Sequence, residues 1–164
     1  MELTPINAHM STVYGNMEAT RCIDGDKTGD EVCHSNCQEN APWLALEFVE
    51  GTVEVTRVDI YNKNKNGAKT KNLEVRLTNE LPTSGDQMYT GGELLGTFAG
   101  PGGNGEIIKV EGSALTGKYV LIQMDNKDCL NLLEVGVFGS VIIATTTPTT
   151  TTTTTNPGKR INFV

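Results

Sequence analysis

The feature that most limits the fold of this chain is a series of short apolar stretches with turn residues between them. Apolar and polar residues alternate within most stretches, and Gly, Asn, Pro and Thr separate them at about the 8–12-residue spacing of an all-β fold. No long segment has the 3.6-residue period of an amphipathic helix. The predicted strands are 43–48, 53–61, 73–77, 94–98, 106–110, 119–124 and 133–138. So many strands need two packed layers to bury their apolar faces, which predicts an all-β sandwich.

The composition of the chain changes after residue 142. We expect residues 1–142 to form one folded domain, because this length allows a hydrophobic core. Residues 143–164 are rich in Thr and Pro, which is typical of a mucin-like tail or linker that is O-glycosylated in secreted eukaryotic proteins. Residues 159–164 regain strand character. The alternative is therefore a strand that pairs with the sheet edge of a neighbouring copy and builds a homo-oligomer or filament.

Charge, hydropathy and motifs argue against several classes of protein. The formal net charge is −7 and no basic stripe is present, so we expect no nucleic-acid partner. No apolar stretch reaches the length that crosses a bilayer, so we expect no membrane span. The chain has no Ser–His–Asp order, nucleophile elbow or zinc-enzyme signature, and we expect that it is not an enzyme.

The four cysteines, Cys22, Cys33, Cys37 and Cys129, predict two disulfides. Cys33 and Cys37 have the spacing of half a zinc site, but the other two cysteines form no second close pair. Disulfides indicate an oxidising compartment, so we expect a secreted, extracellular protein. Four cysteines permit three pairings, and their spacing does not choose among them.

Two carboxylates flank a glycine at Asp24, Gly25 and Asp26. Oxygen ligands on a tight glycine turn suit a hard cation such as Ca²⁺, but Asp-Gly is also common turn chemistry, and both interpretations stay open. Far along the chain, Glu134 has apolar neighbours. A buried carboxylate there would need a partner, which a cation would supply, and an exposed strand residue is the alternative.

Six segments, in order along the chain, resemble the F-type lectin (fucolectin) domain. They are Ser-Thr-Val-Tyr at 11–14 with Ala19, Cys-Ile-Asp-Gly-Asp at 22–26, Pro-Trp at 42–43, Val-Asp-Ile-Tyr-Asn-Lys at 58–63, Gly-Lys-Tyr-Val at 117–120 and Leu-Leu-Glu-Val-Gly-Val-Phe-Gly at 132–139. This family belongs to the discoidin-like, coagulation factor 5/8 type C superfamily. The resemblance covers about residues 5–139 and implies a jelly-roll β-sandwich of the galactose-binding-domain-like class.

The resemblance implies a buried Ca²⁺ site near the sugar-binding loops. The implied ligands are the carbonyl oxygens of Arg21, Asp26 and Val32 and the carboxylates of Asp24 and Glu134. Val32 stands where the family has a serine, so one hydroxyl ligand is lost. A ligand set made only of oxygen suits Ca²⁺ rather than Zn²⁺.

The resemblance also implies a sugar site, because the family binds L-fucose through one histidine and two arginines. Counted back from Trp43, the histidine position falls on Ser35, with His34 one residue earlier. The arginine positions fall on Lys63 and, with one deletion, on Lys69. Lysine is a point charge where arginine is a two-pronged donor, so these replacements predict altered recognition of fucose.

The segment 62–71 is basic on an acidic chain. We interpret it as a rim that binds an anionic glycan, such as a sulfated or sialylated one, and the alternative is a solvated loop. For His34 the alternative is a surface histidine without a ligand.

The disulfide pairing is constrained by the resemblance but is not settled by it. Cys33 matches a family cysteine whose partner position is Leu133 here. The resemblance therefore implies that Cys129 pairs with Cys33 or Cys37, and Cys22 with the other.

These features predict a secreted, calcium-dependent, lectin-like module for cell-surface or matrix glycans, fucosylated or anionic, in a glycoprotein that takes part in cell adhesion. Bound Ca²⁺ would order the loops in advance and lower the cost of binding sugar. The alternative is a structural or adhesive module whose sugar site is lost and which assembles through residues 143–164.

Overall fold

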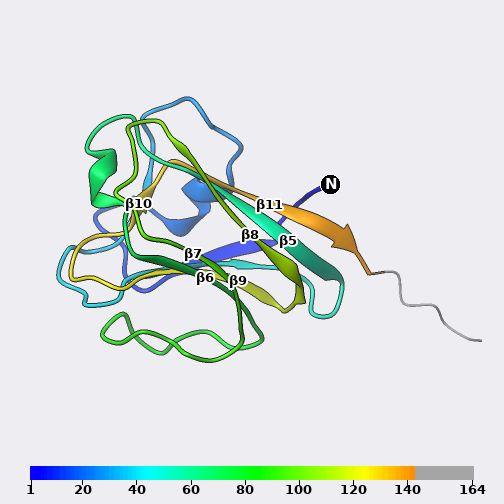
Figure 1. Ribbon diagram of the computed structural model, residues 1–164. Helices are drawn as coiled ribbons and strands as arrows, with labels where there is room; N and C mark the ends of the chain where they lie inside the picture. Colours follow the sequence, from blue (N-terminus) through cyan, green and yellow to red (C-terminus); the bar gives the residue numbers. More distant parts are fainter. Residues whose placement is uncertain (143–164) are drawn as a thin grey trace, which may run out of the picture.

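The computed structural model describes residues 1–142, which form a sandwich of two antiparallel sheets (Figure 1). The elements are β1 (Glu2–Leu3), β2 (Asn7–Met10), η1 (Ala19–Ile23), β3 (Cys33–His34), β4 (Trp43–Glu47), β5 (Val53–Tyr61), η2 (Gly67–Lys69), β6 (Leu73–Thr78), β7 (Glu93–Phe98), β8 (Ile107–Thr116), β9 (Tyr119–Met124), β10 (Asn131–Leu132) and β11 (Glu134–Val141), where η1 and η2 are 3₁₀-helices. One sheet has the order β1-β11-β5-β8, the other β2-β4-β9-β6-β7, and β3 pairs with β10 separately. The predicted all-β sandwich is confirmed.

Strands β4 to β9 and β11 lie where the sequence predicts strands, whereas β1, β2, β3 and β10 were not predicted. β5 and β9 have the predicted bounds, 53–61 and 119–124. β8 continues to Thr116, well past its predicted end at residue 110. Residues 111–116 are mostly exposed and carry no alternating pattern. Glu111, Leu115 and Thr116 nevertheless pair with β5 on either side of a register shift, with Thr116 opposite Glu54. Backbone pairing, rather than side-chain burial, therefore extends this strand.

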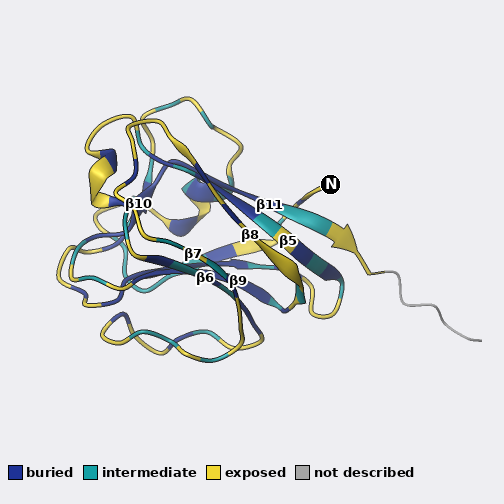
Figure 2. Ribbon diagram, viewed as in Figure 1, coloured by how far each residue is buried: buried dark blue, intermediate teal, exposed yellow. Residues whose placement is uncertain are grey.

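Both faces of the five-stranded sheet are covered, and all six residues of β9 are buried for this reason. The inner face packs against the other sheet in one continuous core, which includes Leu46, Val58 and Ile122. The outer face carries a smaller cluster, which consists of Trp43, Ala45, Tyr119 and Leu121 packed against Leu81 and Tyr89 of the connection between β6 and β7. Figure 2 shows the buried residues along the strands and the exposed residues concentrated in the loops.

Two disulfides link the loops at one end of the sandwich. Cys22 of η1 pairs with Cys33 of β3, and Cys37 pairs with Cys129, 92 residues further along the chain. The structure thus selects one of the pairings that the sequence left open. A cross-link over so long a loop removes much of the conformational entropy of the unfolded chain.

The Thr-rich tail predicted for residues 143–164, with its strand and its glycosylation, lies outside the described residues. Within residues 1–142, no helix has the length and apolar character needed to cross a membrane.

Candidate functional site

The candidate residues come from four segments that gather at one end of the sandwich, on the left and at the top in Figure 1. These segments are 24–32 after η1, β3 with the residues that follow it, 62–71 with η2, and 125–133 around β10. The pairing of β3 with β10 places Asn131 opposite His34, although the two residues are far apart in sequence. We call this end of the molecule the loop end.

The Asp24–Asp26 segment is a turn held by its own carboxylates. An oxygen of Asp24 accepts the backbone N–H of Asp26 at 2.8 Å. One oxygen of Asp26 accepts the backbone N–H groups of Thr28 at 2.9 Å and Gly29 at 2.8 Å. These two backbone hydrogen bonds lower the pKa of Asp26. Gly25 has a φ of 87°, which a residue with a side chain rarely adopts.

Glu134 at the start of β11 is buried, with 5% of its surface exposed. Its Oε1 atom accepts the backbone N–H of Gly25 at 3.3 Å, whereas Oε2 has no hydrogen-bond partner among residues 1–142. Burial is the main cause that raises the pKa of Glu134 to about 7, and the negative charge of Asp24 raises it further, while the Gly25 hydrogen bond opposes the shift. A buried carboxylate oxygen without a partner is the kind of atom that a cation would satisfy.

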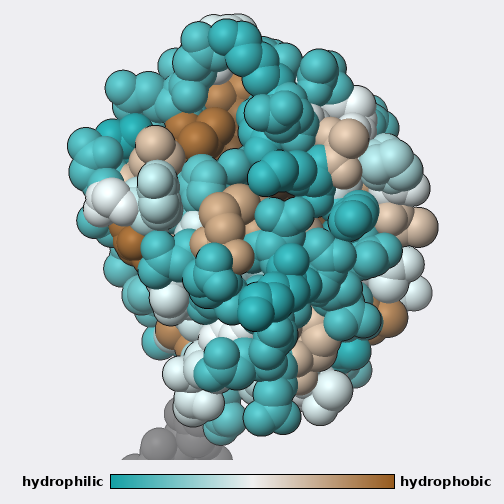
Figure 3. All heavy atoms as spheres, turned by 90° about the vertical axis from the view of Figure 1, so that its left-hand side faces the viewer, coloured by the Kyte–Doolittle hydropathy of each residue, from teal (hydrophilic) through white to brown (hydrophobic). Residues whose placement is uncertain are grey.

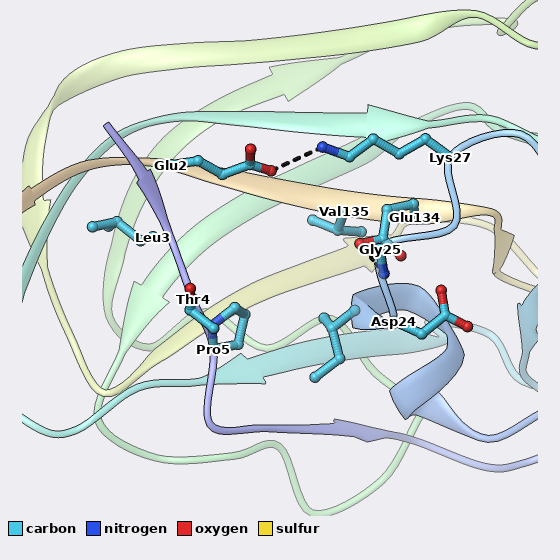
Figure 4. Close-up of a pocket in the computed structure, with 10 residues that line it drawn as sticks. Glu2, Leu3, Thr4, Pro5, Asp24, Gly25, Lys27, Glu134 and Val135 are labelled. Atoms are coloured by element: carbon cyan, nitrogen blue, oxygen red, sulfur yellow. Dashed lines mark hydrogen bonds and ion pairs between the residues drawn. The ribbon is translucent and has the colours of Figure 1, made fainter.

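Glu134 and the Asp24 turn border a cavity of about 350 Å³ that the N-terminal strand closes on one side (Figure 4). Lys27 reaches across it and donates to the Glu2 carboxylate at 3.0 Å. Figure 4 shows the Asp24 carboxyl turned away from the Glu134 carboxyl. The two proposed carboxylate ligands therefore come from adjacent segments but do not face each other.

Val32, another residue implied as a metal ligand, does not line the cavity beside Glu134. Val32 borders a different cavity, beside Lys63 and Leu133. In residues 1–142, the side chains of three metal-ligating residues approach within 4.8 Å of one another at His34, Cys37 and Cys129. The two sulfurs are joined in a disulfide and are not thiolate ligands, so the alternative of a zinc site at Cys33 and Cys37 is wrong. The unpartnered oxygen of Glu134 is the observation that fits a cation.

Ser35 was a candidate sugar contact, but a sugar cannot reach it, because its side chain is completely buried. Its hydroxyl accepts the backbone N–H of Leu130 at 3.0 Å, and its own N–H donates to the Leu130 carbonyl at 2.9 Å. Ser35 therefore joins two loops and does not face solvent.

His34, Lys63 and Lys69 do come together at the loop end, through two acceptors from the β10 segment. The Lys63 ammonium donates to the side-chain oxygen of Asn131, the neighbour of His34. Lys69 lies 3.8 Å from a carboxylate oxygen of Asp128. We call these five residues the Lys63 cluster.

Within this cluster, Lys63 has a shifted pKa and His34 contacts an aromatic ring. Lys63 is partly buried, and this burial lowers the pKa of its ammonium, as does the positive charge of Lys69, whereas Asp128 opposes the shift. His34 donates from Nδ1 to the Ser35 carbonyl at 2.6 Å, and its ring lies 5.2 Å from that of Tyr14. The imidazole of this cluster is thus held beside the exposed ring of Tyr14.

The basic segment 62–71 has a fixed backbone, although several of its lysines are solvated. Asn62 is buried, and its amide donates to the carbonyls of Gly67 at 3.0 Å and Gly103 at 2.8 Å. Its oxygen accepts the hydroxyl of Thr70 at 2.8 Å. The sequence predicted either a glycan-binding rim or a solvated loop, and the backbone order is compatible with a rim.

Sequence reasoning did not identify Tyr14, Asp128 and Asn131 as candidate site residues. Asn131 and Asp128 lie in a segment without periodicity. The β3–β10 pairing places Asn131 beside His34, and the fold brings Asp128 close to Lys69. Tyr14 belongs to the segment 11–14 that resembles the F-type lectin family, and this resemblance was the signal that could have identified it.

No protein-family model matches the chain, and no curated protein matches its sequence. Solved structures do match. The lectin domain of lectinolysin, complexed with Lewis b antigen, has a TM-score of 0.64 at 26% identity over 82% of this chain and 92% of that chain. The fucolectin of striped bass serum (Morone saxatilis) has a TM-score of 0.69 at 22% identity over 81% of this chain and 46% of that chain. This domain has the F-type lectin fold.

The F-type lectin fold extends to other carbohydrate-binding modules. A Streptococcus pneumoniae fucose-binding module has a TM-score of 0.67 at 19% identity over 85% of this chain and 96% of that chain. CBM32-like modules of the same fold are also among the neighbours. The neighbours are binding modules rather than catalytic domains, although some come from enzymes, such as the chitosan-binding module of a Paenibacillus chitosanase/glucanase.

Proposed function

We propose that this domain binds glycans through the Lys63 cluster at the loop end. The observation that carries the proposal is the Lys63 ammonium, which is partly buried and bonded to Asn131 beside His34. An ammonium, an amide and an imidazole supply the donors and acceptors that sugar hydroxyls need. The fixed backbone around Asn62 lowers the cost of ordering the loop when sugar binds. The lectins and fucose-binding modules with this fold support the proposal.

The ligand class is a fucosylated or anionic glycan of a cell surface or matrix. Lys63 and Lys69 carry positive charge, and in the described residues Asp128 is the acid that pairs with Lys69. A lysine contacts a hydroxyl, carboxylate or sulfate as a point charge, without the paired geometry of arginine. This chemistry favours negatively charged substituents over neutral ones.

The proposal includes Ca²⁺ at the Asp24 turn. Glu134 would be the principal ligand, because its Oε2 atom is buried without a partner. Asp24 would supply the second carboxylate after rotation of its exposed side chain, and the carbonyls of Arg21, Asp26 and Val32 would complete an oxygen shell. Bound Ca²⁺ would hold the turn against β11 and so stiffen the loop end.

The two disulfides favour a secreted, extracellular setting. A module of this kind would serve cell adhesion, in a glycoprotein if the Thr-rich segment carries sugar. The second candidate, a structural module that assembles through residues 143–164, depends on residues outside the described range.

A glycan array tests the proposal, probed with the folded protein in Ca²⁺ and again in EDTA. We expect binding to fucosylated or anionic glycans in Ca²⁺ and weaker binding in EDTA. Binding to no glycan under either condition would reject the lectin function. Equal binding under both conditions would reject the calcium dependence alone.

A further inference from the structure

A second cavity lies beside the Lys63 cluster and shares Lys63 with it. This cavity measures about 290 Å³ and lies between residues 29–32 and residues 63–65, with Leu133 at its base. Figure 3 shows the loop end, where hydrophilic residues predominate and hydrophobic patches lie recessed between them. We call this cavity the Val32 pocket.

The Val32 pocket has an apolar floor and a charged rim. Leu133 is buried and Val32 is half-buried, and together they present hydrocarbon to the cavity. Lys65 and Asp30 are exposed at its edge, and Lys63 lines it as well. A concave apolar surface with a few polar groups around it is the usual form of a small-molecule site.

Its walls are fixed before any ligand binds. On one side, Asp26 holds the turn that contains Gly29 through hydrogen bonds to the backbone. On the other side, Asn62 holds the basic segment. Asn64 joins the two walls, because its amide donates to the Gly29 carbonyl at 3.4 Å. A preformed pocket saves the entropy that would otherwise be spent on ordering the loops.

Lys63 connects the Val32 pocket with the Lys63 cluster, since it lines the pocket and donates to Asn131. A glycan held by the cluster would therefore extend its next residue over Val32. A volume of about 290 Å³ lies at the lower limit for ligand pockets and suits one sugar ring.

We propose that the Val32 pocket is an extension subsite that binds a second sugar ring bearing a carboxylate or sulfate, with the C–H face of the ring on Val32 and Leu133 and the anionic group on Lys65. This inference rests on the proposed glycan binding at the Lys63 cluster and names how the domain selects among glycans. Charge-assisted hydrogen bonds are about twice as strong as neutral ones. Lys63 already donates to Asn131, so Lys65 is the lysine of the pocket lining that is assigned to the anionic group.

The test compares sialylated or sulfated glycans with their neutral parents on one array, followed by titration calorimetry of the best pair. We expect the charged glycan to bind about 10-fold more tightly than its parent, as one added charge-assisted contact allows. K65M should lower this ratio and leave binding of the neutral parent unchanged. V32F should fill the pocket and lower the ratio as well. K109M, which replaces an exposed lysine on β8, is the matched control.

The outcomes separate this inference from the proposed function. If the wild-type protein binds charged and neutral glycans equally, or if K65M and V32F leave their ratio unchanged, the extension subsite is rejected and the lectin function stands. If no glycan binds, both proposals fall. Melting temperatures of K65M and V32F within a few degrees of wild type show that a lowered ratio does not come from unfolding.

Discussion

The Glu134 carboxylate accepts the backbone N–H of Gly25 at 3.3 Å across a sequence separation of 109 residues. This contact joins the start of β11 to the Asp24 turn. The other oxygen of Glu134 has no hydrogen-bond partner in the described part of the chain, and burial raises the pKa of the group to about 7. The loop end therefore contains a carboxylate whose charge is poorly stabilised at neutral pH unless a cation is present.

The metal-free domain should lose stability as pH rises from about 4.5 to above 7. The pKa of Glu134 is 4.5 in its ordinary state and about 7 in the folded state, so the folded protein holds the proton over this range while the unfolded chain releases it. The stabilisation that comes from the proton on Glu134 is complete below the unfolded pKa of 4.5 and is lost above the folded pKa of about 7. The expected loss is at most about 3 kcal/mol, measured by urea unfolding in EDTA at pH 5 and pH 8.

Glu134→Gln should remove most of this difference, because an amide does not titrate. Glu54→Gln on the neighbouring strand, where the carboxylate contacts Ser140, should leave it intact. A wild-type protein that unfolds with the same free energy at both pH values would contradict the unpaired, buried state of Glu134.

Calcium should stabilise the domain. At a free concentration about 100 times the dissociation constant, a single site adds about 2.7 kcal/mol to the free energy of unfolding. The expected observation is a rise of several degrees in melting temperature on adding Ca²⁺ to EDTA-treated protein. Glu134→Gln should lose this rise and Glu54→Gln should keep it. If the wild-type protein melts at the same temperature with and without Ca²⁺, the proposed Ca²⁺ site at Glu134 is rejected.

Lys63→Met should weaken glycan binding by about 10-fold or more. Methionine keeps the apolar stem but cannot donate to Asn131 or to a sugar, and a contact to a charged group contributes about 1.5–3 kcal/mol. Titration calorimetry with the tightest-binding glycan measures the change. Lys109→Met serves as the control for charge, and unchanged affinity in Lys63→Met would place the sugar elsewhere.

Asn62→Ala should destabilise the whole loop end. The buried amide satisfies the carbonyls of Gly67 and Gly103, and its loss leaves buried polar groups unpaired. The expected cost is about 2–4 kcal/mol in urea unfolding. Asn64→Ala removes a similar side chain from an exposed position and should cost less than about 1 kcal/mol. Equal costs for the two variants would show that Asn62 does not support the segment.

The Cys37–Cys129 disulfide should be reduced before the Cys22–Cys33 disulfide in the folded protein. Cys37 is exposed, whereas Cys22 and Cys33 are both fully buried and closed to a reductant. Alkylation after brief treatment with a mild reductant, followed by mass spectrometry, gives the order. Loss of the longer cross-link should lower the free energy of unfolding by about 2–5 kcal/mol. Simultaneous reduction of both disulfides in native buffer would show that the loop end opens more readily than its burial indicates.

The strand pattern was predictable wherever a strand is amphipathic or continuously apolar. β5 alternates because one of its faces meets the core, so its bounds followed from its side chains. The short strands β3 and β10 have two residues each and no period, so they were not predicted. They exist because disulfides and backbone pairs bring their segments together.

The candidate site likewise has features that the sequence determines and features that only the tertiary structure decides. The sequence alone determined the two-layer β-fold, the disulfide chemistry and the presence of a carboxylate at residue 134 among apolar neighbours, since these depend on residue type and local spacing. The tertiary structure alone decided that Ser35 faces inward, that Lys63 meets Asn131 and that Cys37 pairs with Cys129. Such contacts join residues that are distant in the chain, and counting along the chain cannot show which way a loop side chain faces. Their geometry follows from how the loops pack together, and not from any local pattern.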